Sequence, residues 1–121
     1  MNALDVHYSS GVANHFYYLL AEGAVVPSGF GAGTWANLTS SSLVCNGNTS
    51  IVGIGRDAAA KIWFRALTVY MNSTTNYSSL TNSAGIATVK AAKDLYGSGS
   101  TQYNAVYAAW AAVNITVAPG L

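Results

Sequence analysis

Apolar residues recur at the spacing of an α-helix in four separate stretches of this chain. The stretches cover residues 10–22, 53–71, 82–96 and 100–113. Because apolar side chains three or four residues apart line one face of a helix, each stretch needs a partner surface to cover that face. The pattern predicts an all-α domain, a compact bundle of about four main helices. A long irregular loop, residues 24–51, follows the first helix.

Serine and glycine residues mark where these helices are predicted to begin and end. A side-chain oxygen of Ser9 or Ser10 can accept the free backbone N–H groups of the first helix, and Ser100 can do the same for the last. Gly23 suits the left-handed residue that follows a helix. Gly85 works against the start of the third helix, because glycine costs roughly 1 kcal/mol relative to alanine inside a helix.

The same spacing predicts which side chains face the core. Each helix contributes one row of them, and the long loop contributes a few anchors onto the body. The expected core residues are Val12, Phe16, Leu19 and Leu20, then Ala59, Ile62, Trp63, Ala66, Leu67 and Tyr70, then Thr88, Val89, Ala92, Leu95 and Tyr96, then Tyr103, Val106, Trp110 and Val113, with Trp35, Leu38, Leu43 and Val44 as the loop anchors.

Charge is sparse and balanced in this chain. Of its 121 residues only 7% are charged, the formal net charge is +1, and 51% are hydrophobic. A polyanion finds no basic field here, so we expect no nucleic-acid partner. No apolar run reaches the roughly 18–20 residues of a membrane span, so we expect no membrane partner. The length suits one domain, and we see no internal repeat and no second domain in residues 1–121.

The compartment is not fixed by these features. The first 20 residues lack the pattern of a signal peptide, which predicts a chain that is either intracellular or already stripped of its export signal. A single cysteine, Cys45, cannot form an internal disulfide. The five Asn-x-Ser/Thr sequons are what chance produces in a chain rich in these residues, so we predict no glycosylation.

Familiar catalytic and binding motifs are missing. The two histidines, His7 and His15, do not form a His-Glu-x-x-His zinc helix, and one cysteine cannot complete a thiolate cage. His15 lies beside the apolar face and is interpreted as a packing residue. The Gly-Ile-Gly of residues 53–55 does not follow a clear strand, so it is interpreted as a tight approach to the second helix rather than a nucleotide site. Cys45 has no cationic neighbour to lower the pKa of its thiol, and we expect it to be unreactive.

His7 is the one residue left with a chemical option. A histidine just before a helix is most often an ordinary boundary residue. A helix start nevertheless carries a partial positive charge and free N–H groups, so it attracts anions and disfavours imidazolium. An imidazole there can donate a hydrogen bond to a developing oxyanion. From the residues alone, both interpretations stay open and no reaction follows.

Three blocks of the sequence resemble a known family. "VHYSSGVANHFYYLLAEG" resembles the Val-His-x-x-Ser-Gly segment of the C-terminal helical domain of thermolysin-like neutral zinc metalloproteases. "IVGIGRDAAAKIWFRALTVYM" is similar to the family's next helix, and "AAKDLYGSGSTQYNAVYAAWAAVN" is similar to its last two. The blocks come in family order. The actinobacterial branch is nearest, judging from "DVHYSSG" and the low charge.

The resemblance implies part of a secreted zinc endopeptidase. In this family a zinc-bound water attacks the peptide carbonyl, and the histidine matching His7 hydrogen-bonds the tetrahedral oxyanion. The zinc ligands and the general base come from the preceding zinc-binding domain, and calcium sites belong largely there as well. We therefore expect no metal to be bound by these 121 residues, and no peptide hydrolysis by them alone.

Two positions depart from the family pattern near the histidine. The family commonly has an aspartate five residues before it, which orients the imidazole, whereas this chain has Asn2. Asp5 lies two residues before His7 and is the candidate replacement. The residue two after the histidine is often asparagine in the family, and here it is Ser9.

Two functions from different classes remain as hypotheses. The first is the helical half of a thermolysin-like endopeptidase, severed from its other half, with Met1 interpreted as an added start residue. The second is a non-catalytic helical module for folding or partner binding, in which His7 is incidental. If the domain is isolated, the face that normally packs on the catalytic partner is bare, so we expect self-association through the helix that starts near Ser10.

Overall fold

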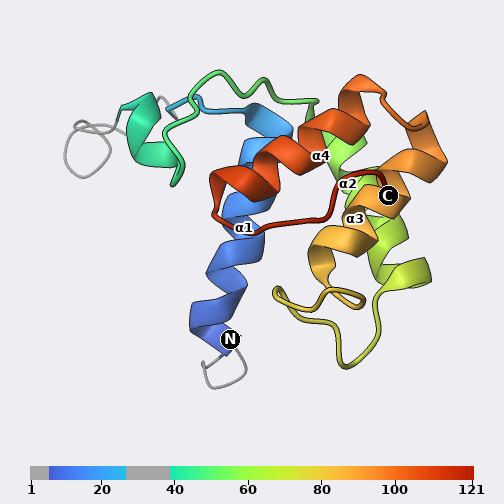
Figure 1. Cartoon of the computed structure of the whole chain (residues 1–121). Coiled ribbons are helices and arrows are strands. Elements are labelled where there is room, and N and C mark those ends of the chain that lie inside the picture. Colours follow the sequence, from blue (N-terminus) through green and yellow to red (C-terminus); the bar gives the residue numbers. More distant parts are fainter. Residues whose placement is uncertain (1–5, 27–38) are drawn as a thin grey trace.

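The computed structural model describes residues 6–26 and 39–121, with residues 6–10 described by their backbone. Its α-helices are α1 (Val6–Glu22), α2 (Arg56–Arg65), α3 (Ala84–Tyr96) and α4 (Thr101–Ala112) (Figure 1). A short 3-10 turn, η2 (Ser40–Leu43), follows α1, and a π-helix, η3 (Ala66–Tyr70), continues α2. Over the described ranges the structure contains isolated β-bridges and no strand. The predicted all-α bundle is confirmed.

The core lies where α1 and α3 meet α2 and α4. Helix α1 contacts both α2 and α4, and α3 contacts both of them as well. Phe16, Leu19 and Leu20 of α1 are buried there, as the spacing predicts. The ring of Phe16 stacks on that of Trp110 in α4, with centroids 3.8 Å apart and planes 10° apart. Aromatic pairs of this kind contribute about 0.5–1.5 kcal/mol beyond the area that they bury.

Helix α1 begins earlier than its apolar spacing predicts. Its first residue is Val6, so Ser9 and Ser10 lie inside the helix and are not its caps. Nothing from Val6 to Ser10 is a proline or glycine that would break a helix. The ends predicted at Gly23 and Ser100 are confirmed: Gly23 adopts φ +79° and donates its N–H to the Leu19 carbonyl at 2.9 Å, and the Ser100 side chain accepts from the Tyr103 N–H at 3.1 Å.

Helix α2 begins three residues later than predicted because residues 53–55 serve another purpose. The N–H of Ile54 donates to the Leu20 carbonyl at 2.9 Å, and the N–H of Gly55 donates to the Ala21 carbonyl at 3.0 Å. These are carbonyls of the last turn of α1, which have no partner within their own helix. Gly53 lies so close to the Ala21 carbonyl that a Cβ would collide with it. The Gly-Ile-Gly segment is therefore a C-terminal cap for α1 as well as a tight approach to α2.

Two residues expected in the core are exposed. The π-helix bond from the Met71 N–H to the Ala66 carbonyl, at 2.8 Å, spans five residues rather than four. Leu67, the residue after the buried Ala66, is 47% exposed. Leu95 is 41% exposed because the fully buried face of α3 ends at Ala92.

The described parts of the loop after α1, residues 24–26 and 39–51, are irregular as predicted, apart from η2. Val44 is buried and Leu43 half-buried against the core, so both act as anchors. Trp35 and Leu38 lie outside the described residues. None of the helices in the described parts of the chain is both long and apolar enough to cross a membrane.

Candidate functional site

His7 is the second residue of α1, in the helix rather than before it. With 3.6 residues per turn, position 7 shares a helix face with Asn14 and Tyr18, two and three turns further on. The buried residue Phe16 lies half a turn away from that face. The helix register thus places position 7 on the side of α1 opposite the core. Asp5, its candidate orienting residue, lies outside the described residues, as does Asn2.

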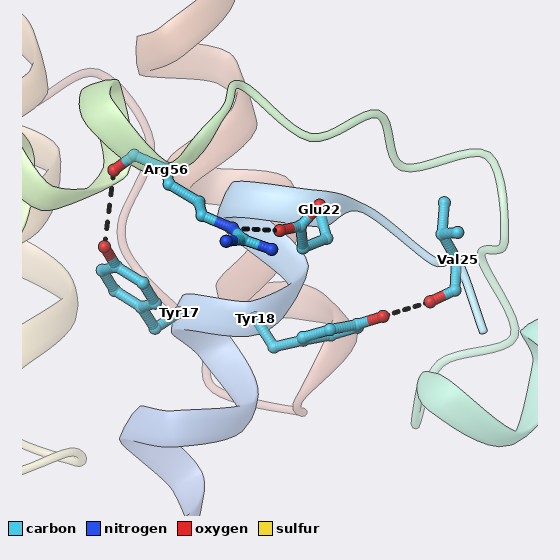
Figure 2. A network of polar contacts seen from close by, with 5 residues as sticks. All are labelled: Tyr17, Tyr18, Glu22, Val25 and Arg56. Carbon is cyan, nitrogen blue, oxygen red and sulfur yellow. Dashed lines mark hydrogen bonds and ion pairs between the residues drawn. The ribbon is translucent and has the colours of Figure 1, made fainter. Parts of the chain in front are cut away.

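A surface pocket of about 360 Å³ runs along this same face of α1, towards its C-terminal end. Figure 2 shows the polar contacts around it. Tyr17 and Tyr18 project from α1, and Arg56 approaches from the first turn of α2. The residues that line the pocket are Asn14, Tyr17, Tyr18, Ala21, Glu22 and Arg56.

Hydrogen bonds fix the orientation of most of these side chains. The Tyr17 hydroxyl donates to the Arg56 carbonyl at 3.5 Å, and the Tyr18 hydroxyl donates to the Val25 carbonyl (Figure 2). The Arg56 Nε lies 2.8 Å from Glu22 Oε1, in an ion pair whose arginine side chain is 85% exposed. Because solvent screens so exposed a pair, it orients the two side chains more than it stabilises the fold.

Two of the ionisable side chains in the pocket, Tyr18 and Arg56, are unsuited to act as general bases. Burial, and secondarily the negative charge of Glu22, raise the pKa of the Tyr18 hydroxyl. The hydrogen bond to Glu22 raises the pKa of Arg56. Tyr18 is therefore a neutral phenol and Arg56 a cation at neutral pH, and neither can serve as a general base.

The structure also shows the surroundings of His15 and Cys45, the other residues that the sequence analysis considered. The half-buried His15 ring is hydrogen-bonded through Nε2 to the Leu43 carbonyl, so it ties α1 to η2 and agrees with its interpretation as a packing residue. Cys45 is an exposed free cysteine, and its backbone N–H donates to the Ala112 carbonyl at 2.6 Å. Within residues 6–26 and 39–121, no three His, Cys, Asp or Glu side chains gather where they could hold a metal ion.

The tyrosines of α1 and the Glu22–Arg56 pair were not predicted from the sequence. Both tyrosines are half-buried and contact the core, so nothing in the sequence separates them from packing residues. A usable signal existed for the ion pair: with only five Lys or Arg and four Asp or Glu in 121 residues, any charge close to a helix end is a candidate for pairing.

The sequence blocks predict an all-α bundle of this kind, and the structure adds that its first helix begins at Val6 and is capped by the Gly-Ile-Gly segment. The family model described as the thermolysin metallopeptidase alpha-helical domain matches residues 1–115. The chain therefore belongs to this family.

The chain is also similar in sequence to three curated proteins. It is 45% identical over 115 residues to the transglutaminase-activating metalloprotease of Streptomyces mobaraensis. The aligned region covers 95% of this chain and 14% of that protein. It is 37% identical over 110 residues both to bacillolysin of Bacillus caldolyticus and to thermolysin of Alicyclobacillus acidocaldarius, over 91% of this chain and 16% of each relative. The chain thus spans about one seventh to one sixth of the relatives' length.

Proposed function

We propose that this chain is the C-terminal helical domain of a secreted zinc-dependent metalloendopeptidase that hydrolyses peptide bonds. The observation that carries the proposal is the family match over residues 1–115, together with relatives that are named metalloprotease and thermolysin. Residues 1–121 act as a single domain in this proposal. Its partners are the peptide or protein substrate and an N-terminal zinc-binding domain of the same polypeptide.

The catalytic group that this chain contributes is His7. Its place in the first turn of α1, on the face opposite Phe16, supports a side chain that serves a site outside the helical body. There the imidazole donates a hydrogen bond to the oxygen that becomes negatively charged as the peptide carbonyl is attacked. Asp5 orients the ring in this proposal, in place of the aspartate that the family commonly has where this chain has Asn2.

The residues of this chain do not fit a zinc site. The sequence contains two histidines and one cysteine, without a His-Glu-x-x-His motif, and the described residues bring no three candidate ligands together. We therefore assign the zinc, and any calcium, to residues outside these 121. The domain alone is proposed to be catalytically inactive and to associate with copies of itself.

The test of the His7 assignment is His7→Ala in the complete enzyme that contains this domain. Loss of one oxyanion donor typically costs about 2.7–4 kcal/mol of transition-state stabilisation. We expect kcat for a peptide substrate to fall roughly 10²–10³-fold while KM changes little, because the bond strengthens only as charge develops.

His15→Ala is the matched control, since it removes the chain's other histidine from the same helix. Its ring bonds the Leu43 carbonyl, so we expect a loss of stability with kcat nearly unchanged. An equal kcat for His7→Ala and the parent enzyme would dismiss the assignment. The coding sequence ahead of residue 1 tests the broader proposal, because it must supply a His-Glu-x-x-His motif and a downstream glutamate.

A further inference from the structure

The segment after α4 turns back across the bundle and ends beside α3 (Figure 1). Asn114 reverses the chain with φ +59°, a left-handed conformation common just after a helix. The Asn114 N–H donates to the Ala111 carbonyl and the Ile115 N–H to the Trp110 carbonyl, each at 3.0 Å. These two bonds form a Schellman motif, which ends α4 and sets the direction of residues 115–121.

Val117 meets α3 at Gly85. A Cβ placed on Gly85 would lie closer than 3.0 Å to the Cγ2 methyl of Val117, a contact that real side chains do not make. Its distance to the Val117 Cβ would be 3.7 Å, an ordinary contact. The space for the valine methyl therefore exists because residue 85 has no side chain. This contact explains why a glycine stands at a position where alanine would favour the helix more.

Hydrogen bonds from both helices hold the rest of the segment. The Tyr107 hydroxyl of α4 donates to the Ala118 carbonyl at 2.8 Å and accepts from the Leu121 N–H at 3.3 Å. The Lys93 Nζ of α3 donates to the Leu121 carbonyl at 2.8 Å. Ile115, Val117 and Leu121 are half-buried against the core. The segment thus contacts both helices through side chains and backbone.

We propose that residues 114–121 form a strap that fastens α3 to α4, seated by the Val117 methyl in the space left open at Gly85. Residues 116–121 lie beyond the part of the chain that the family model matches. The strap thus begins within the matched region and runs to residue 121. Its role is conformational, and it does not depend on the catalytic assignment of His7.

The test compares Gly85→Ala in two backgrounds of the full chain, by thermal unfolding followed by circular dichroism. In the parent, the new methyl collides with Val117, and we expect Tm to fall by roughly 5 °C or more. In a Val117→Ala background the colliding methyl is gone. There we expect Gly85→Ala to leave Tm unchanged or to raise it by about 1–3 °C, because alanine is the better helix former.

Gly11→Ala is the matched control, because Gly11 lies within α1 and a Cβ there meets nothing within 4 Å. It should raise Tm in both backgrounds alike. If Gly85→Ala shifts Tm equally with and without the valine, the proposal is wrong. If Gly85→Ala alone fails to fold, a folded Gly85→Ala/Val117→Ala double variant supports the strap, and an unfolded one overturns it.

Discussion

Trp110 is the residue on which three helices converge. Its ring is fully buried, stacks on Phe16 of α1, and donates its Nε1–H to the Thr88 hydroxyl of α3 at 2.8 Å. The Thr88 hydroxyl in turn lies within hydrogen-bond distance of the Ala84 and Gly85 carbonyls. Because the indole N–H is fully buried, this threonine is the partner that makes its burial tolerable.

We expect Thr88→Val to lower the free energy of unfolding by about 1–3 kcal/mol. The valine keeps the shape of the side chain but leaves the Trp110 N–H buried without an acceptor. Urea denaturation of the 121-residue chain measures the change. Thr68→Val is the control: that hydroxyl is exposed and donates to the Phe64 carbonyl, so its loss should stay within about 0.5 kcal/mol. Equal effects of the two substitutions would argue against the buried bond.

At the scale of elements, one polar cluster joins the end of α2, η3 and α3. The Arg65 Nε donates to Asp94 Oδ2 at 2.9 Å, and the Tyr70 hydroxyl donates to the same oxygen. The π-turn brings Tyr70 to this position although it lies five residues after Arg65. These bonds, that of Tyr70 first and that of Arg65 second, lower the pKa of Asp94.

The cluster predicts a small acid sensitivity. Because the pKa of Asp94 is lower in the folded chain, its contribution to stability is present above the unfolded value of about 3.9 and is lost as pH falls through the folded value. We expect Asp94→Asn to be less stable than the parent at pH 7 and to lose less stability between neutral pH and the acid range below that value. Thermal unfolding across pH measures this difference. Tyr70→Phe should remove part of the effect, and parallel pH profiles for parent and Asp94→Asn would contradict it.

The helices themselves could be predicted from spacing, but several of their limits could not. Phe16, Val89 and Val106 are buried as their spacing predicts. Apolar residues repeat at the helical period because one face of each helix must pack against the core. The start of α2 depends on which carbonyls residues 53–55 cap, and those belong to α1, 34 residues earlier. The π-turn after α2 could not be predicted either, because one wider turn leaves no periodic signature in so short a segment.

The candidate site was predictable only in part, for a related reason. His7 stands close to a predicted helix start, so it could be singled out although α1 begins earlier than predicted, and its role remains a proposal. The pocket beside α1 includes Arg56, which is 34 residues from its partner Glu22. Such a pairing depends on how two helices pack, and the residues next to Glu22 and Arg56 in the sequence do not indicate it.

At the scale of the whole molecule, the chain carries few charges and exposes several large hydrophobic side chains. A net charge of +1 gives copies of the chain little electrostatic repulsion. Phe64, at 68% exposed, and Leu67 lie close together on α2 and η3, and the tyrosines of the α1 pocket form a second apolar area. Exposed apolar area of this kind favours association. Of the two areas, the α1 face is the one that shares a side of the helix with position 7, where the proposed enzyme would place its other domain.

We therefore expect the isolated chain to self-associate through the α1 face. Tyr17→Lys puts a charge on that face and should lower the molar mass measured by light scattering at high protein concentration, because burying an unpaired ammonium group is costly. Phe64→Lys adds the same charge to the α2 area and is the matched control, with no change in mass expected. A parent chain that stays monomeric at every concentration would contradict self-association itself. Dissociation by Phe64→Lys but not by Tyr17→Lys would show that copies associate through the α2 area. The α1 face, which carries position 7, would then not be the surface that mediates self-association.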